Sequence, residues 1–316
     1  MKRAVVFPQK YVRFSKHKER FHGKMLLLGE IMKEKLSFDV YFVSSAADFP
    51  YDSDVIFFYA EANAIGFMSS IMDKLPKKTR FIGLFVDYDI HRYDSELFHR
   101  ILERCDLVLG SSYAVFKRKY PFFISKYVYF PHFFAPHSEY VDFNFNENPK
   151  MKCLLSGQTR RQYLIRHSVA QEVEHNPRLR KQIDILEHPR KDCKAFFTRQ
   201  NKGYEGYVKI LHEYFCCLTD SGTPQDTQVV AKYFEIPATG SLLLASVAPD
   251  LEQIDLVPNV HFVPIRKETV FSQIEDCLLY PENYQKIRQD GMSLVRRNHS
   301  INNRFVRLKM LLEAYA

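Results

Sequence analysis

Residues 230–245, VAKYFEIPATGSLLLA, contain a helix, a turn and a buried strand within one short stretch. The helix carries Lys232 and Glu235, the turn falls at Gly240, and the strand at 241–245 is almost entirely apolar. An uninterrupted apolar strand is typical of a parallel sheet covered on both faces. Lys232 and Glu235 are three residues apart and therefore share one helical face, near the carboxyl end of the preceding strand. In doubly wound folds, ligands bind at that end.

The same alternation of strands and helices extends to both sides of this stretch, and it predicts an α/β fold of βαβ units. The expected strands are 4–7, 39–43, 55–59, 80–86, 107–109, 127–130, 152–155, 183–186, 214–218, 241–245 and 261–263. The expected helices are 25–35, 63–73, 96–105, 113–119, 163–172, 204–213, 229–234, 270–279, 282–295 and 302–314. A polar stretch at 136–150 interrupts the alternation. We therefore predict two doubly wound, Rossmann-like domains at 1–135 and 151–300, joined by a linker at 136–150.

Composition and charge limit the class of protein. The 316 residues are 46% hydrophobic and 26% charged, which excludes disordered, collagenous and coiled-coil proteins. A net charge of +8 favours anionic partners such as phosphate esters. The six cysteines are too few for a disulfide scaffold, and without C-x-x-C or H-E-x-x-H we expect no structural zinc. No apolar stretch approaches the ~20 residues of a membrane-spanning helix, so we expect a cytoplasmic protein.

The common nucleotide and hydrolase motifs are absent from the sequence. It has no G-x-G-x-x-G, no G-x-x-x-x-G-K-[ST] and no G-x-S-x-G. These absences argue against dinucleotide dehydrogenases, P-loop kinases and the commonest α/β hydrolases.

Residues 230–245 resemble the donor-site signature of GT-B glycosyltransferases, above all the group 1-like and CgeB-like enzymes. Their pattern is approximately Lys-x-Phe-Glu, a small residue, Gly, and an apolar strand. Similar short motifs occur in the same order at 152–166, at 207–221 and, towards the end, at 259–263, Gly291, His299 and Arg304. The resemblance covers about residues 150–310, and more weakly 85–131. It implies the GT-B architecture, in which two Rossmann-like domains face a cleft and a C-terminal helix, here 301–316, crosses back to the first domain.

The resemblance also implies roles for single residues. Glu235 matches the acid that binds the nucleotide ribose, and Lys232 would lie near the diphosphate. The remaining residues expected at the donor site are Ser156, Gly157, Arg160, Arg161, Ser221, Gly222 and Gly240. Solvated charge is an equal alternative for Arg160 and Arg161, and for Arg166 we expect a structural role in an ion pair. Backbone N–H groups and a helix N-terminus after the strand at 152–155 can also hold phosphate.

One position departs from the pattern. Many retaining members of this group carry a second acid eight residues before the ribose acid, where this chain has Thr227. The stereochemical outcome therefore stays open. An inverting transfer needs a base, and Asp87, Asp89 and His91 follow the predicted strand 80–86 at its carboxyl end. The alternative for these residues is an Asx turn with helix capping, and we give no weight to the likeness of Asp87-x-Asp89 to a metal-binding D-x-D.

We therefore expect a metal-independent glycosyltransferase without a cofactor. It would move a sugar from a nucleoside diphosphate to a hydroxyl of a glycan, a lipid or a small molecule, with peripheral membrane contact as a further option. One alternative is a GT-B-like protein that binds nucleotide or glycan without turnover. The other is a polyanion binder using the basic residues Lys10, Arg13, Lys16, Lys18 and Arg20, although the lack of nucleic-acid motifs predicts no nucleic-acid partner.

Overall fold

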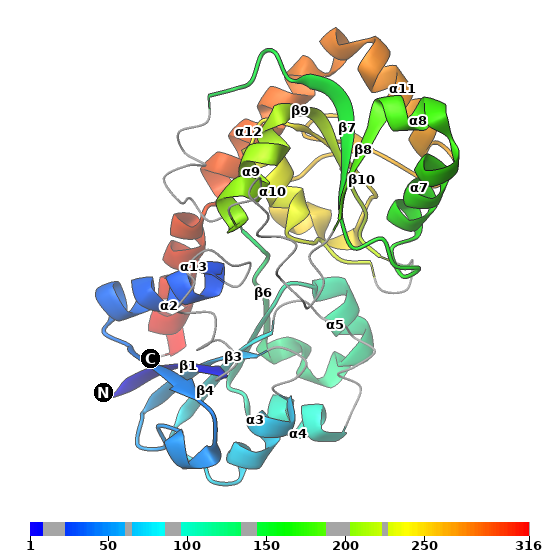
Figure 1. The fold of residues 1–316 in the computed structure, drawn as a ribbon. Helices are drawn as coiled ribbons and strands as arrows, with labels where there is room; N and C mark the ends of the chain where they lie inside the picture. Colours follow the sequence, from blue (N-terminus) through cyan, green and yellow to red (C-terminus); the bar gives the residue numbers. More distant parts are fainter. Residues whose placement is uncertain are drawn as a thin grey trace. The chain divides into compact units, whose positions relative to one another are not determined.

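The computed structural model describes residues 1–8, 23–60, 65–85, 96–133, 144–187, 203–222 and 227–315. The chain divides into two compact units (Figure 1). Unit 1 consists of Met1–Pro131 together with Ile301–Ala316, and unit 2 consists of His132–Ser300. Each unit is built around its own parallel sheet.

Unit 1 contains a six-stranded sheet in the order β2-β1-β3-β4-β5-β6, in which every neighbouring pair is parallel. The strands are β1 (Arg3–Pro8), β2 (Asp39–Val43), β3 (Val55–Ala60), β4 (Arg80–Phe85), β5 (Leu107–Gly110) and β6 (Tyr127–Tyr129). The helices are α2 (Gly23–Leu36), α3 (Ile65–Met72), α4 (Glu96–Arg104), α5 (Tyr113–Lys119) and α13 (Ile301–Tyr315), with 3-10 turns η2 (Ala46–Asp48) and η5 (Pro121–Lys126). All of β4 after Arg80 is buried, as its uninterrupted apolar sequence predicts.

The last helix of the chain belongs to unit 1. α13 packs beside α2, as the red and blue helices of Figure 1 show. Its stripe of Ile301, Phe305, Leu308 and Leu312 is buried, while Val306 and Met310 on the opposite side are exposed. The buried residues recur every three to four positions, so one apolar face holds the helix against the unit.

Unit 2 contains a five-stranded parallel sheet in the order β11-β10-β9-β7-β8. The strands are β7 (Lys150–Gly157), β8 (Ile183–Glu187), β9 (Tyr214–Thr219), β10 (Leu242–Ala245) and β11 (Val263–Pro264). The helices are α7 (Leu164–His175), α8 (Pro177–Gln182), α9 (Gly203–Glu213), α10 (Lys232–Ala238), α11 (Val270–Leu279) and α12 (Gln285–Asn298), with 3-10 turns η6 (Pro249–Ile254) and η7 (Pro281–Tyr284).

Helices cover both faces of the unit 2 sheet. Buried residues of β7, β9 and β10 form one core with apolar residues of α7 and α11. α9, α10 and α12 contact one another or the strands on the other side (Figure 1). With both faces covered, these strands need apolar side chains in both directions, which explains the unbroken burial of β9 and β10.

The structure confirms the predicted fold class, with local differences. α10 begins at Lys232, later than the predicted 229, and continues through Pro237 to Ala238. α8 was not predicted because its sequence, PRLRKQ, has almost no apolar periodicity. Its start is nevertheless encoded: Asn176 accepts a hydrogen bond from the Arg178 N–H at 3.0 Å, and Pro177 occupies the first turn. No helix within the described ranges is long and apolar enough to cross a membrane.

Candidate functional site

The carboxyl ends of β10, β9 and β7 lie side by side in the unit 2 sheet, because these strands are parallel neighbours. After β7 the chain crosses through α7 to β8 on one side, and it returns through α9 to β9 on the other. α7 and α9 therefore leave this edge on opposite faces of the sheet. Such a change of direction is where doubly wound folds bind ligands.

Two predicted donor-site residues, Lys232 and Ser156, meet at this edge through a tyrosine. The Lys232 Nζ donates a hydrogen bond to the Tyr207 hydroxyl at 2.6 Å and lies 4.7 Å from the centre of the tyrosine ring. The same hydroxyl is 3.3 Å from the Ser156 Oγ. All three side chains are buried. The first residue of α10 is thus connected to the end of β7 through α9.

Gly157, the last residue of β7, lies against the same lysine. Its φ of +103° falls in the left-handed region that favours glycine. A β-carbon at this position would lie 2.8 Å from both the Arg166 Nη1 and the Lys232 Cε. Gly157 therefore lets two cationic side chains approach the backbone at the end of β7.

Glu235 lies one turn after Lys232 on α10, and its side chain is only 1% exposed. Burial, followed by the negative charge of Glu235, raises the pKa of Tyr207 well above its usual value. The Tyr207 hydroxyl therefore keeps its proton at neutral pH and accepts from Lys232 as a neutral group. Glu235 is thus a buried acid on the same helix as Lys232.

Arg166 and Asp220 form a buried ion pair at the end of β9. The Arg166 Nε donates to the Asp220 Oδ1 at 2.6 Å, and the two side chains are 4% and 1% exposed. The Asp220 Oδ2 accepts from the backbone N–H groups of Ile165 at 2.9 Å and Arg166 at 3.3 Å. The ion pair expected for Arg166 is confirmed.

The hydrogen bonds from the Ile165 and Arg166 N–H groups to Asp220 also bear on the expected phosphate site at the start of α7. We expected the backbone N–H groups of this helix to be available for phosphate. Two of them instead hold the Asp220 carboxylate, which takes the place of an external anion at the positive end of the helix. A phosphate near this edge would have to use the loop before α7 and the cationic side chains.

Ser221 and Gly222 continue the chain after β9. The Ser221 N–H donates to the Ser246 Oγ at 2.9 Å, and the two serine hydroxyls are 2.8 Å apart. The Tyr233 hydroxyl donates to the Ser246 carbonyl at 2.6 Å. These bonds fasten the end of β9 to the end of β10 and to α10. Gly222 has a φ of +104°, in the left-handed region that favours glycine.

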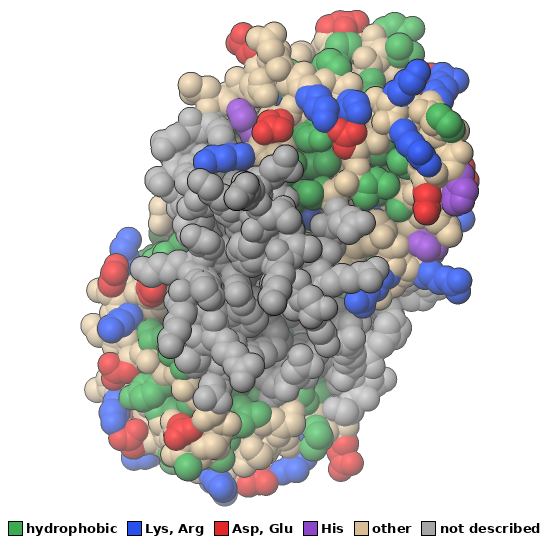
Figure 2. Space-filling model, in the orientation of Figure 1, with side chains coloured by type: hydrophobic (Ala, Val, Ile, Leu, Met, Phe, Trp, Pro, Cys, Tyr) green, Lys and Arg blue, Asp and Glu red, His purple; other side chains and the backbone are tan. Residues whose placement is uncertain are grey.

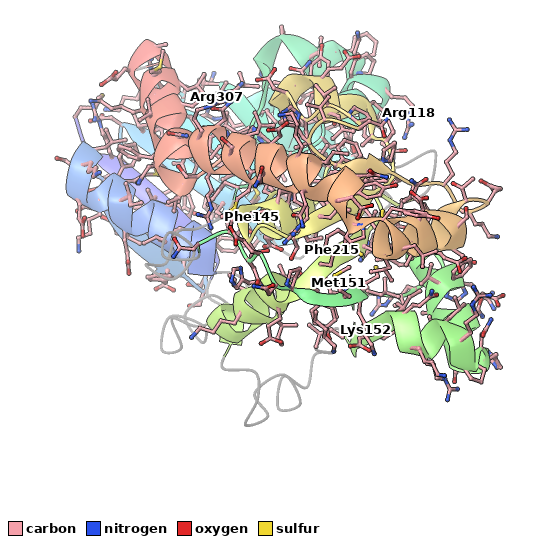
Figure 3. The ribbon with its side chains drawn as sticks, turned by 90° about the horizontal axis from the view of Figure 1, so that it is seen from above. Arg118, Phe145, Met151, Lys152, Phe215 and Arg307 are labelled. Atoms are coloured by element: carbon pink, nitrogen blue, oxygen red, sulfur yellow. The ribbon has the colours of Figure 1, made fainter. Side chains whose placement is uncertain are left out.

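Gly240 does not join this cluster. It ends α10 with a φ of +82° and precedes β10, so it lies towards the opposite, amino-terminal edge of the sheet. Its carbonyl accepts a hydrogen bond from the Arg288 Nε at 3.0 Å. The Arg288 guanidinium lies 4.5 Å and 4.9 Å from the ring centres of Phe145 and Phe215, which Figure 3 labels. Burial lowers the pKa of Arg288 to about 10, and these contacts give Gly240 a structural role.

The remaining predicted residues are exposed or lie outside the described residues. Arg160 and Arg161 are exposed in the loop between β7 and α7. Asp87, Asp89 and His91 fall within 86–95, and the basic residues between Lys10 and Arg20 fall within 9–22; neither segment is described. On the face shown in Figure 2, the described Lys and Arg side chains are mixed with Asp and Glu. Among the described residues, no group of three His, Cys, Asp or Glu side chains could hold a metal ion.

Sequence reasoning missed the roles of three residues in this cluster: Tyr207, Asp220 and Ser246. Asp220 and Ser246 each follow directly after an apolar strand, and this position was the available signal. Tyr207 gave a weaker signal, because it lies among apolar residues of an amphipathic helix and is indistinguishable from a core residue in sequence.

No protein-family model matches the chain, and no curated protein matches its sequence. Solved structures do match its fold. An α-glucosyltransferase in complex with UDP-glucose and DNA containing an abasic site superposes with a TM-score of 0.65, at 9% identity over 99% of both chains. The chain has the GT-B fold. HepE of Anabaena in complex with UDP superposes with a TM-score of 0.63, at 10% identity over 99% of this chain and 100% of that one. A glycosyltransferase from Rickettsia africae superposes with a TM-score of 0.54, at 13% identity over 98% of this chain and 97% of that one.

Proposed function

We propose that the protein is a glycosyltransferase that moves a sugar from a nucleoside diphosphate to a hydroxyl group. One observation carries the proposal: the Lys232 side chain packs against Gly157 at the carboxyl edge of the unit 2 sheet, where its strand order changes direction, and Glu235 is buried one turn further along α10. Two of the structures that share the fold were solved with UDP or UDP-glucose, which makes UDP the first donor nucleotide to test.

In this proposal, the unit 2 cluster binds the donor. Glu235 accepts hydrogen bonds from the ribose hydroxyls, and Lys232 neutralises the diphosphate. Ser156, near the end of β7, and the exposed arginines of the following loop, Arg160 and Arg161, would also bind the diphosphate. Positive charge there would stabilise the departing diphosphate as the bond to the sugar breaks, so this charge acts on the transition state.

Unit 1 is proposed to bind the acceptor, and Asp87, Asp89 or His91 is proposed to take the acceptor proton. The acceptor class is open among glycans, lipids and small molecules. The expectation that nucleic acid is excluded loses support, because one protein of the same fold was solved with DNA. DNA therefore belongs among the acceptors to be assayed. Metal independence is also part of the proposal, and turnover that survives EDTA would support it.

The test begins with nucleotide binding. Calorimetry and thermal shift are measured with UDP, GDP, ADP, CMP and dTDP on the natural protein, on Glu235→Ala, and on Glu268→Ala as an exposed control from unit 2. Saturable binding of one nucleotide, weakened at least tenfold only in Glu235→Ala, would support the donor site. Release of free nucleotide from the matching sugar donor, in the presence of an acceptor, then separates an enzyme from a binding protein.

Two results would contradict the proposal. A folded protein that binds none of the nucleotides has no donor site. Binding with no turnover on any acceptor class would instead favour a GT-B-like binding protein, an alternative that the threonine at position 227 keeps open.

A further inference from the structure

The hydroxyl of Tyr207 joins three elements of unit 2. Tyr207 lies on α9, its side chain is 2% exposed, and its hydroxyl contacts Lys232 of α10 and Ser156 of β7. The Lys232 contact, at 2.6 Å, is the shorter of the two. Tyr207 thus reaches both side chains that the proposed function places at the donor phosphates.

A buried ammonium needs such a contact. Moving a charged group away from water is costly unless hydrogen bonds compensate for the loss, and Lys232 is only 9% exposed. The tyrosine hydroxyl provides a neutral acceptor for one N–H of the ammonium. Because this acceptor is neutral, the hydrogen bond itself adds no negative charge next to the ammonium.

A lysine and a tyrosine form a similar contact at the opposite, amino-terminal edge of the same sheet. Lys150 Nζ lies 3.0 Å from the Tyr214 hydroxyl and 4.6 Å from its ring centre, almost the geometry of Lys232 and Tyr207. There, Asp184 forms ion pairs with both Lys150 and Lys152. Lys150 is also 47% exposed. The pair of Lys150 and Tyr214 is therefore a natural control within the same unit.

The tyrosine also fixes the position of the Lys232 side chain. A lysine side chain has a flexible four-carbon stem, and several rotamers compete when no contact selects one. Here the hydroxyl selects the rotamer in which the Lys232 stem passes Gly157, where a β-carbon would be only 2.8 Å from Cε. A side chain fixed before the ligand arrives loses less entropy when the ligand binds.

We propose that Tyr207 is a positioning residue, which holds the Lys232 ammonium beside Gly157 so that it meets the diphosphate of the donor. The inference rests on the proposed function. It assigns Tyr207 no contact with the reacting atoms: the tyrosine acts only through Lys232. Its removal therefore weakens binding of the diphosphate and leaves binding of the nucleoside unchanged.

The experiment measures dissociation constants for UDP and for uridine by calorimetry. It compares the natural protein, Tyr207→Phe, Lys232→Met, the double variant, and the control Tyr214→Phe. Tyr207→Phe keeps the aromatic ring and removes only the hydroxyl. We expect its UDP affinity to fall about tenfold, as for loss of a hydrogen bond to a charged group, with uridine unchanged. In the Lys232→Met background the same change should have no further effect, and Tyr214→Phe should bind UDP like the natural protein.

Three outcomes would overturn the inference. One is an equal loss of UDP and uridine affinity in Tyr207→Phe, which indicates a general structural role. Another is an undiminished effect of Tyr207→Phe when Lys232 is already methionine. The third is unchanged UDP affinity in Tyr207→Phe. Failure of the proposed function is distinguishable from all three, because then the natural protein itself would bind neither ligand. Melting temperatures of Tyr207→Phe and Tyr214→Phe report whether the two substitutions disturb folding equally.

Discussion

At the scale of single residues, Gly157 is the position where a small change should have the largest local effect. Alanine there must adopt a φ of +103° and place its β-carbon 2.8 Å from Arg166 and Lys232. We expect Gly157→Ala to lower the free energy of unfolding by about 1–3 kcal/mol and to weaken UDP binding. Chemical denaturation and calorimetry measure the two effects.

The control for this substitution is Gly66→Ala in α3, where a β-carbon would meet nothing within 4 Å. A helical glycine replaced by alanine without a clash should leave stability unchanged or raise it by up to ~1 kcal/mol. If Gly157→Ala behaved like Gly66→Ala, the close packing of Lys232 against the end of β7 would be disproved.

Asp184 should make stability depend on pH in the acid range. It accepts hydrogen bonds from Lys150, Lys152 and Tyr214. Burial opposes its ionisation, but these bonds outweigh burial and lower its pKa to about 2. Because the folded pKa is depressed below the ordinary 3.8, the stabilisation is complete above that value and disappears as the pH falls towards 2.

The expected size of this effect is about 1–2 kcal/mol at neutral pH, allowing for solvent screening. Asp184→Asn should therefore unfold at a lower temperature than the natural protein at pH 6, and the gap should narrow by roughly half at pH 3. Melting curves at both pH values test this, with exposed Glu268→Gln as the control. A gap of the same size at both pH values would show that the carboxylate is not held ionised by its neighbours.

At the scale of elements, the start of α7 depends on a residue from another strand. Asp220 satisfies two N–H groups of this helix and also pairs with Arg166. Removing one partner of a buried ion pair costs about 3–5 kcal/mol, because the other charge stays buried. Arg166→Met leaves the capping bonds intact, so we expect it to cost less than Asp220→Ala.

A double-mutant cycle measures this coupling. The variant with both substitutions should lose about 1–3 kcal/mol less than the sum of the two single losses, because no uncompensated charge remains. Thermal unfolding of the four proteins provides the values. Additive losses would mean that the two side chains do not depend on each other.

The bounds of single elements show how much of the fold the sequence could predict. Strand β2 and the helices α5 and α11 match their predicted bounds. In α11 the buried residues Val270, Ile274 and Cys277 recur every three to four positions, so apolar periodicity and burial agree there. The bounds of α10 were harder to predict, since all seven of its residues are buried and a helix buried on every side shows no alternation of apolar and polar faces. Contacts between elements are harder still to predict from sequence. The meeting of Tyr207 with Lys232 depends on the order of β7, β9 and β10 in the sheet, which local sequence does not encode.

At the scale of the whole molecule, the two units share one architecture, a parallel sheet whose strand order changes direction. Each sheet changes direction once, between β1 and β3 in unit 1 and between β7 and β9 in unit 2. In unit 2 the described residues at that point form a charged, hydrogen-bonded cluster. In unit 1 the residues after β1, β3 and β4 lie outside the described ranges, and Asp87, Asp89 and His91 are among them.

Because each unit has its own sheet and core, we expect calorimetric heating to reveal two transitions. Leu308→Ala in α13 and Ile274→Ala in α11 each truncate a side chain that is at most 1% exposed, so each should destabilise its own unit by about 2–5 kcal/mol. Leu308→Ala should then lower one midpoint and Ile274→Ala the other. UDP at a hundredfold excess over its dissociation constant should stabilise by ~2.7 kcal/mol, and it should raise only the midpoint that Ile274→Ala lowers. If UDP instead raised the midpoint sensitive to Leu308→Ala, the nucleotide would bind unit 1, and the assignment of donor and acceptor to the two units would have to be reversed.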